Sequence, residues 1–183
     1  DVCSSDLDTD IRVSKLCVGC MSFGKAGTMH DWTLDEKQSE KLVNKALELG
    51  INFFDTANCY SLGTSEEYLG RAIRKYAKRE EVVLASKVYF NEGRLSKQAI
   101  RREIDGTLKR LGTDYLDLYI IHRFDYETPV EETMEALDSL VKDGKVRALG
   151  ASAMYGYQFY NMQMAAEKNG FTKFSAMENH YNL

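Results

Sequence analysis

The sequence contains no long apolar run, and this absence limits the classes of protein to which the chain can belong. A helix that spans a membrane needs about 18 to 20 consecutive apolar residues, and no stretch of the sequence approaches that length. No charged, apolar and small-residue leader pattern is present either. We therefore expect a cytoplasmic protein that has no membrane partner.

Concentrated positive charge is also absent. The chain has 24 Lys and Arg residues against 28 Asp and Glu residues, which gives a formal net charge of −4. Proteins that bind nucleic acid normally present a concentrated basic face to the phosphates, so we expect no nucleic-acid partner. The hydrophobic content of 44% is that of a globular chain able to bury a core.

Cysteine is scarce, and only Cys17 and Cys20 form a C-x-x-C pair. A separation of three residues on a strand directs the two side chains to opposite faces. The helix N-terminus that makes such thiols acidic in redox proteins is not predicted here. We therefore expect no redox pair at these cysteines and no metal site.

Strand-like and helix-like hydrophobic periods alternate along the chain from residue 16 onward, with short loops and no linker. The predicted strands cover residues 16–21, 51–54, 82–88, 116–121, 146–151 and 174–178. The predicted helices cover residues 35–49, 65–76, 96–111, 128–142 and 158–169. Ser65 and Ser96 are expected to be N-caps, and Thr128 is expected to open a capping box in which Pro129, the only proline, takes the first helical position.

Six strands that alternate with five helices imply one α/β domain with a parallel sheet. A closed (β/α)₈ TIM barrel typically needs about 250 residues, so we expect an incomplete barrel here. A doubly wound domain with six strands is the alternative. No G-x-G-x-x-G follows the first predicted strand, which argues against that alternative.

Three ionisable residues follow or end three successive predicted strands. These residues are Asp55, Lys87 and His122, and Tyr60 lies just beyond the first of them. The carboxyl ends of parallel strands share one rim, so an acid, an amine, an imidazole and a phenol are expected to meet there. A phenol near an ammonium can donate a proton to a developing alkoxide, and an imidazole can orient the carbonyl group.

The segments from Gly50 to Tyr60 and from Ser65 to Gly70 resemble the signature of the aldo-keto reductases, and the strand that begins at Leu116 fits a later strand of that family. This resemblance implies a (β/α)₈ barrel, NADPH as cofactor, and reversible hydride transfer between nicotinamide and an aldehyde or ketone. It also implies that Tyr60 is the general acid, that Lys87 and Asp55 lower its pKa, and that His122 orients the carbonyl.

The resemblance further implies cofactor contacts from Met21, Gly24, Asp55, Ser152 and Glu178. Two positions depart from the family pattern. Ala153 stands where asparagine is common, and Glu178 stands where glutamine is expected. A carboxylate can accept a hydrogen bond from the nicotinamide amide but cannot donate one to it.

The bend from Ile121 to Asp125 is most similar to microbial and fungal members of the family that act on aryl or small aliphatic aldehydes. Trp32 and Phe90 are aromatic residues near the rim, where they either line an apolar pocket or take part in ordinary packing. A non-enzymatic alternative remains open, because the β subunits of voltage-gated potassium channels resemble the same family and bind nicotinamide as a regulatory sensor.

Residues 1–7 resemble the translated end of a sequencing adapter. We therefore expect the native chain to begin near Asp8, and residues 8–183 to form a partial barrel domain of a C-terminally truncated protein. Such a fragment is expected to be inactive alone, because its sheet edges would be exposed and the phosphate site of such barrels commonly follows the last two strands.

Overall fold

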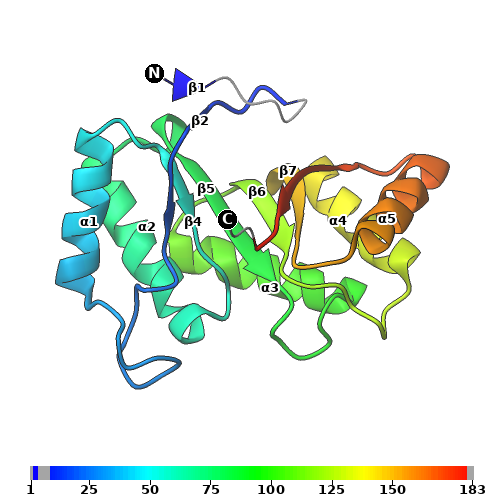
Figure 1. The fold of residues 1–183 in the computed structure, drawn as a ribbon, viewed down its shortest axis with the longest axis horizontal. Coiled ribbons are helices and arrows are strands. Elements are labelled where there is room, and N and C mark those ends of the chain that lie inside the picture. Colours follow the sequence, from blue (N-terminus) through cyan, green and yellow to red (C-terminus); the bar gives the residue numbers. More distant parts are fainter. Residues whose placement is uncertain (1, 4–8, 181–183) are drawn as a thin grey trace.

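The computed structural model describes residues 2–3 and 9–180. The predicted adapter-derived segment, residues 1–7, lies outside the described residues apart from strand β1 (Val2–Cys3), which pairs antiparallel with β2 (Val13–Ser14). Figure 1 shows this short pair at the edge of the main body of the chain.

The remaining strands form one parallel sheet in which each strand is hydrogen-bonded to the next in sequence order. The strands are β3 (Cys17–Gly19), β4 (Phe53–Asp55), β5 (Val83–Val88), β6 (Leu116–Ile121), β7 (Val146–Ser152) and β8 (Phe174–Glu178). The helices are α1 (Glu36–Glu48), α2 (Thr64–Tyr76), α3 (Lys97–Leu111), α4 (Val130–Lys142) and α5 (Gly156–Asn169). Short 3₁₀ turns, η1 (Tyr60–Gly63) and η2 (Arg79–Glu81), precede α2 and β5.

This topology confirms the predicted fold class. One helix lies between each pair of successive strands of the sheet, and each helix contacts the next one around the outside (Figure 1). Within the described residues β3 and β8 are the two edges and do not pair with each other, so the sheet is an open, six-stranded section of a (β/α)₈ barrel. A doubly wound sheet would reverse its strand order at a switch point, and no reversal occurs here.

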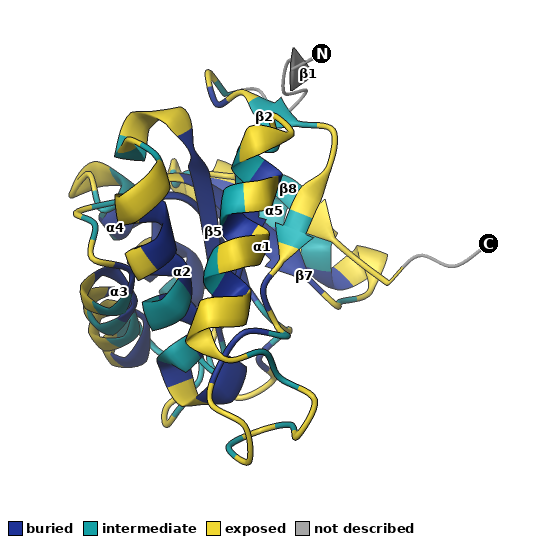
Figure 2. Cartoon of the chain, turned by 90° about the vertical axis from the view of Figure 1, so that its left-hand side faces the viewer, coloured by how far each residue is buried: buried dark blue, intermediate teal, exposed yellow. Residues whose placement is uncertain are grey.

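The two faces of the sheet are buried against different partners. Leu84 and Phe54 belong to the larger apolar cluster between the sheet and the helices. The alternating positions Val83, Ala85 and Leu118 belong to a smaller cluster on the inner, barrel-side face. Every residue of β5 and β6 is buried, and Figure 2 shows β5 in dark blue among helices whose outer faces are exposed.

One predicted N-cap is wrong. The second helix begins at Thr64, and Gly63, with φ of 89°, is the residue that precedes it. Ser65 is buried in the first turn, where its hydroxyl donates to the carbonyl oxygen of Cys20 at 2.7 Å and lies 2.9 Å from the Thr56 hydroxyl. The side chain therefore ties α2 to the loops after β3 and β4, which is a tertiary role that a local capping pattern does not reveal.

The capping box predicted at Thr128 is also wrong. Pro129 is the residue that precedes α4, and no side chain caps the helix. The Thr128 hydroxyl instead donates to the carboxylate of Asp125 at 2.8 Å, in the loop before the helix. Ser96 does cap α3 as predicted, because its hydroxyl oxygen accepts from the backbone N–H of Ala99.

Gly70 lets α2 pack directly against the end of α3, and this contact yields a stability prediction. A Cβ at this position would lie 2.2 Å from the backbone carbonyl oxygen of Leu111. We expect Gly70→Ala to lower the free energy of unfolding by about 1–3 kcal/mol, although alanine is normally the better helix former. Gly156→Ala is the matched control, since nothing lies within 4 Å of its Cβ. Urea unfolding compares the two, and equal midpoints would contradict the packing argument.

Candidate active site

The carboxyl ends of neighbouring strands bring together the four ionisable side chains singled out in the sequence. Asp55 ends β4, and Lys87 is the penultimate residue of β5. His122 follows β6 directly, and its backbone N–H donates to the carbonyl oxygen of Val88 at 3.0 Å. Tyr60 begins the turn η1 in the loop after β4. The four side chains therefore share one rim, as the parallel arrangement predicts.

The side chain of Lys87 is the centre of this cluster and is fully buried. Its ammonium donates to the carboxylate of Asp55, to the carbonyl oxygen of Thr56 at 3.2 Å and to the hydroxyl of Tyr60 at 3.5 Å. The carboxylate of Glu178, at the end of β8, lies 3.6 Å from the same ammonium. A buried charge is costly without such partners, so these contacts hold the ammonium in place beside the phenol.

The turn that carries Tyr60 has an unusual backbone. Ser61 and Leu62 have φ values of 47° and 55°, in the left-handed region that side chains other than glycine rarely adopt. Gly24 packs against this turn, because a Cβ on Gly24 would lie 2.3 Å from the Cβ of Ser61. Strained residues of this kind persist where the surroundings fix them, and here the turn places the buried Tyr60 ring over the rim.

His122 lies against aromatic rings on both sides. Its ring meets those of Tyr60 and Phe90 edge to face, with centroids 5.7 Å and 5.0 Å apart. Its Nδ1 atom is 4.0 Å from the sulfur of Cys59. Phe90 therefore packs at the rim, whereas Trp32 stacks on His30 in the loop after β3 and is exposed.

The pKa values of the ion pair follow from burial and from the neighbouring charges. Burial raises the pKa of Asp55 to about 6, with Glu178 adding to the rise and Lys87 opposing it. Burial lowers the pKa of Lys87, but Asp55, Tyr60 and Glu178 outweigh burial and leave it above its ordinary value. Both groups are therefore charged at pH 7.

The net direction for Tyr60 differs from the sequence-based expectation. Burial raises the pKa of the phenol, Lys87 lowers it, and the charge of Asp55 raises it, so the pKa lies above its ordinary value. The expected ammonium is beside the phenol, but desolvation of the phenolate is the larger effect. Asp55 also holds Lys87 in place beside the phenol, so it has a second, indirect effect on Tyr60.

The imidazole of His122 is expected to have a low pKa in the folded protein. Burial, followed by Lys87 and Arg123, lowers the pKa of His122 from 6.5 to about 4. The stability that the neutral ring contributes is then present above pH 6.5 and is lost progressively as the pH falls towards 4. NMR titration of the ring, assigned with His122→Gln, measures this value. A titration midpoint near 6.5 would show that the ring is exposed to water and free to become charged.

The residues expected to contact a cofactor are spread along the same rim. Met21 is exposed in the loop after β3. The hydroxyl of Ser152 donates to the backbone carbonyl oxygen of Glu178 at 2.7 Å. Ala153, where the family commonly has asparagine, has a φ of 46°, a conformation that asparagine adopts more readily than alanine. The Glu178 carboxylate lies beside Lys87, a contact that no local sequence pattern could have revealed.

One buried acid behind the rim was not predicted from the sequence. Glu66 of α2 is fully buried and accepts hydrogen bonds from the Ser86 hydroxyl at 2.6 Å and from the guanidinium of Arg110. Ser86 precedes Lys87 on β5, so this network anchors the strand that carries the central lysine. Glu66 lies within the family-like segment that starts at Ser65, but its partner Arg110 is 44 residues away, and no local pattern predicts their buried ion pair.

Among the described cysteines, Cys17, Cys20 and Cys59 are all free. Cys17 is exposed and Cys20 is buried, in agreement with the opposite faces expected from their spacing. Burial raises the pKa of Cys59 to about 11, so this thiol is neutral at pH 7 and a poor nucleophile.

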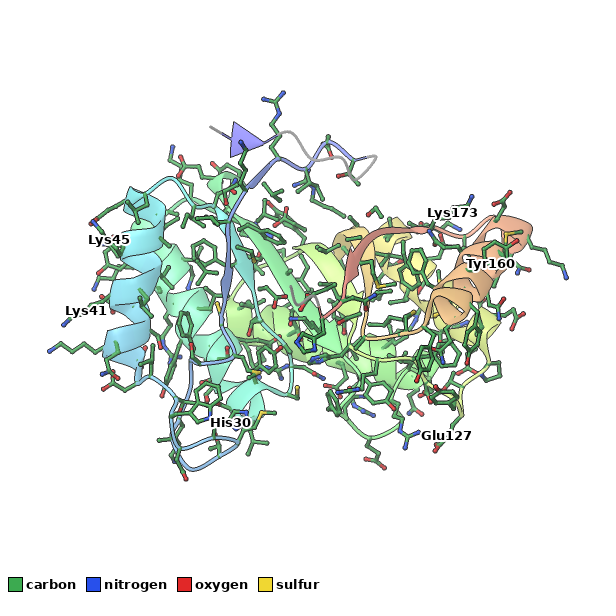
Figure 3. All side chains as sticks on the ribbon, viewed as in Figure 1. His30, Lys41, Lys45, Glu127, Tyr160 and Lys173 are labelled. Carbon is green, nitrogen blue, oxygen red and sulfur yellow. The ribbon has the colours of Figure 1, made fainter. Side chains whose placement is uncertain are left out.

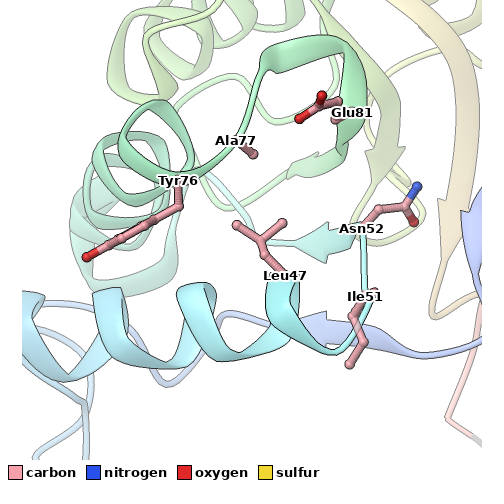
Figure 4. Close-up of a pocket in the computed structure, with 7 residues that line it drawn as sticks. Leu47, Ile51, Asn52, Tyr76, Ala77 and Glu81 are labelled. Carbon is pink, nitrogen blue, oxygen red and sulfur yellow. The ribbon is translucent and has the colours of Figure 1, made fainter.

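A cavity of about 360 Å³ lies at the opposite end of the strands, between the ends of α1 and α2 (Figure 4). The polar side chain of Asn52 there accepts from the backbone N–H of Ser14 at 2.8 Å and donates to the carbonyl oxygen of Arg12 at 3.1 Å. None of the four ionisable residues lines this cavity. Its place at the amino ends of the strands is typical of a stabilising region of a barrel.

The family model named "Aldo/keto reductase family" matches residues 15–183, so the chain belongs to the aldo-keto reductase family. A putative aryl-alcohol dehydrogenase of Schizosaccharomyces pombe is 41% identical over 205 aligned positions, which cover 96% of this chain and 58% of that protein. Versiconal hemiacetal acetate reductase of Aspergillus parasiticus is 40% identical over 200 positions, with 96% and 58% covered. The chain thus spans a little over half the length of these relatives.

Solved structures support the same fold. A thermostable aldo-keto reductase in complex with the inhibitor epalrestat has a TM-score of 0.79 and 30% identity, and the match covers 96% of this chain and 61% of that one. An aldo-keto reductase of Bacillus halodurans in its holo form has a TM-score of 0.75 and 31% identity, with 95% and 55% covered.

The described residues contain neither a candidate membrane-spanning helix nor a candidate metal-binding cluster. No helix among them is long and apolar enough to cross a membrane. In the same part of the chain, no group of three or more His, Cys, Asp or Glu side chains could hold a metal ion.

Proposed function

We propose that the protein reduces aldehydes and ketones to alcohols by hydride transfer from NADPH. The observation that carries this proposal is the buried ammonium of Lys87, which contacts both the carboxylate of Asp55 and the hydroxyl of Tyr60, with the ring of His122 against the Tyr60 ring. A proton donor, a charge that stabilises its conjugate base, and a carbonyl-orienting group are the parts that such a reduction requires.

The residues at the rim are compatible with a nicotinamide amide. Oδ1 of Asp55 is buried and has no hydrogen-bond partner among the described residues, so it can accept from an N–H donor. Ser152 and Glu178 lie together at the carboxyl ends of β7 and β8 and present further acceptors. In our proposal these three residues hold the nicotinamide, and the loop that contains Met21 and Gly24 approaches the rest of the cofactor.

When bound, the nicotinamide cofactor supplies a hydride to the carbonyl carbon. The carbonyl oxygen becomes basic as the carbon accepts the hydride, and it takes a proton from the Tyr60 hydroxyl. Burial keeps the pKa of Tyr60 high, so the phenol is protonated before the reaction. The ammonium of Lys87 stabilises the phenolate that remains, and the neutral ring of His122 donates an N–H to the carbonyl oxygen.

The names of two relatives, an aryl-alcohol dehydrogenase and a hemiacetal acetate reductase, favour aryl aldehydes and related carbonyl compounds as the proposed substrates. The test is to express the full-length gene product and measure the oxidation of NADPH and of NADH with a panel of aryl and small aliphatic aldehydes. The proposal is supported if the aldehydes cause oxidation of the nicotinamide cofactor and if NADPH is oxidised faster than NADH. Tight binding of NADPH without turnover of any aldehyde would instead identify a regulatory nicotinamide-binding protein.

A further inference from the structure

We propose that Arg123 binds a carboxylate on the substrate, so that the preferred substrates are aromatic aldehydes that carry an acid group. This inference deepens the proposed reductase function and rests on it. It starts from an open cavity of about 500 Å³ at the carboxyl ends of β5 to β8, which Arg123, the residue after His122, helps to line. The cavity is lined by aromatic side chains that include Tyr89, Phe124 and Tyr155, and by Arg123.

The composition of the cavity wall favours an aromatic anion. None of the residues that line it is acidic, and Arg123 and His180 are its basic residues. Aromatic rings provide flat apolar surfaces against which a benzene ring can pack. A guanidinium presents paired N–H donors that match the two oxygens of a carboxylate. The cavity therefore suits a molecule with one aromatic ring and one acid group.

Arg123 has no ion-pair partner among the described residues, although two acids lie in the same loop. Glu127, at the lower edge of Figure 3, pairs with Arg94 at 2.7 Å. Asp125 accepts from the backbone N–H of Leu95 and from two donors of its own loop, and it lies 3.7 Å from Arg94. Both carboxylates are therefore already partnered, and the guanidinium of Arg123 remains free to bind an external anion.

The position of Arg123 relative to the reacting groups is also suitable. Its guanidinium lies over the ring of Phe90, 5.6 Å from the ring centroid, and the same ring meets His122 at 5.0 Å. The guanidinium and the imidazole that is proposed to orient the carbonyl therefore contact the same phenyl ring. In our proposal a benzene ring that carries both an aldehyde and a carboxylate contacts the two groups at once.

The test compares 4-formylbenzoate with its methyl ester, which has the same ring and aldehyde but no charge. In the full-length gene product, Arg123→Met is expected to raise KM for 4-formylbenzoate about 10-fold or more and to leave kcat nearly unchanged, because a hydrogen bond to a charged group is lost. KM for the ester should change less than about threefold by the same reasoning. Arg123→Lys should restore part of the affinity for the acid. Arg71→Met is the matched control, since that guanidinium pairs with Glu36 between α2 and α1, away from this cavity, and it should affect neither substrate.

Two outcomes overturn the inference while the reductase function stands. In the first, both substrates are reduced and Arg123→Met leaves KM for the acid unchanged. In the second, the variant raises KM for NADPH instead, which would mean that Arg123 binds a cofactor phosphate. If neither substrate is reduced, NMR titration with benzoate still tests the anion site. Binding that weakens with salt and with Arg123→Met supports the site, whereas equal binding of benzoate by parent and variant refutes it.

Discussion

Replacement of Tyr60 with phenylalanine is expected to lower the turnover number for aldehyde reduction by about 10²- to 10⁴-fold, the usual contribution of general acid catalysis. The phenol proton is transferred in the transition state, so the loss should appear in kcat, whereas the dissociation constant for NADPH should change little. The substitution removes one oxygen from a buried ring beside Lys87 and leaves the ring's packing against His122 in place. Steady-state kinetics together with a direct measurement of NADPH binding separates these effects.

Tyr160→Phe is the matched control for this substitution, because Tyr160 is exposed on the outer helix α5 (Figure 3). It should keep parental kinetics. If Tyr60→Phe also keeps a near-parental turnover number, then another group donates the proton and Tyr60 is only a packing residue.

Lys87→Met is expected to reduce turnover by about 10- to 150-fold, the effect of removing one charge-assisted hydrogen bond to the phenolate. Lys87 lowers the pKa of Tyr60, so its loss should also move the alkaline limb of the pH profile to higher pH. The sign follows because reduction requires protonated Tyr60 and fails above its pKa. The measurement is kcat/KM for one aldehyde as a function of pH in the parent and the variant.

Asp55→Asn should also reduce turnover, by a smaller factor, because Asp55 holds the ammonium of Lys87. The charge of Asp55 raises the pKa of Tyr60, so its loss should move the alkaline limb to lower pH, opposite to the shift in Lys87→Met. Lys145→Met provides the control for loss of a lysine. Lys145 forms an exposed ion pair with Asp105 and lies just before β7, at the amino ends of the strands and therefore opposite the rim. Superimposable pH profiles for the parent, Lys87→Met and Asp55→Asn would disprove the coupling between the ion pair and the phenol.

The position of the four ionisable residues could be predicted from the sequence because it depends only on topology. Asp55, Lys87 and His122 lie at or just beyond the ends of strands, and parallel strands place all their carboxyl ends on one rim. The order of strands and helices could be predicted for the same kind of reason, since hydrophobic period and turn residues are local features.

Contacts between distant segments could not be predicted. The Glu178 carboxylate reaches Lys87 across the rim, and Ser65 bonds to the loop after β3 instead of capping its own helix. The left-handed backbone at Ser61 is imposed by the surrounding structure and has no signal in residue type. The direction of the Tyr60 pKa shift depends on the balance between burial and charge, and burial is a property of the folded chain.

Hydride transfer from nicotinamide to a carbonyl carbon at the Tyr60 site is the central claim, and isotope labelling tests it most directly. The full-length gene product would be mixed with an aryl aldehyde and NADPH dideuterated at C4 of the nicotinamide, and the alcohol product analysed by NMR. We expect one deuterium on the carbinol carbon of the product, formed at least about 10²-fold more slowly by Tyr60→Phe. An alcohol without deuterium, or equal rates for the parent and Tyr60→Phe, would contradict the assignment of this site to carbonyl reduction.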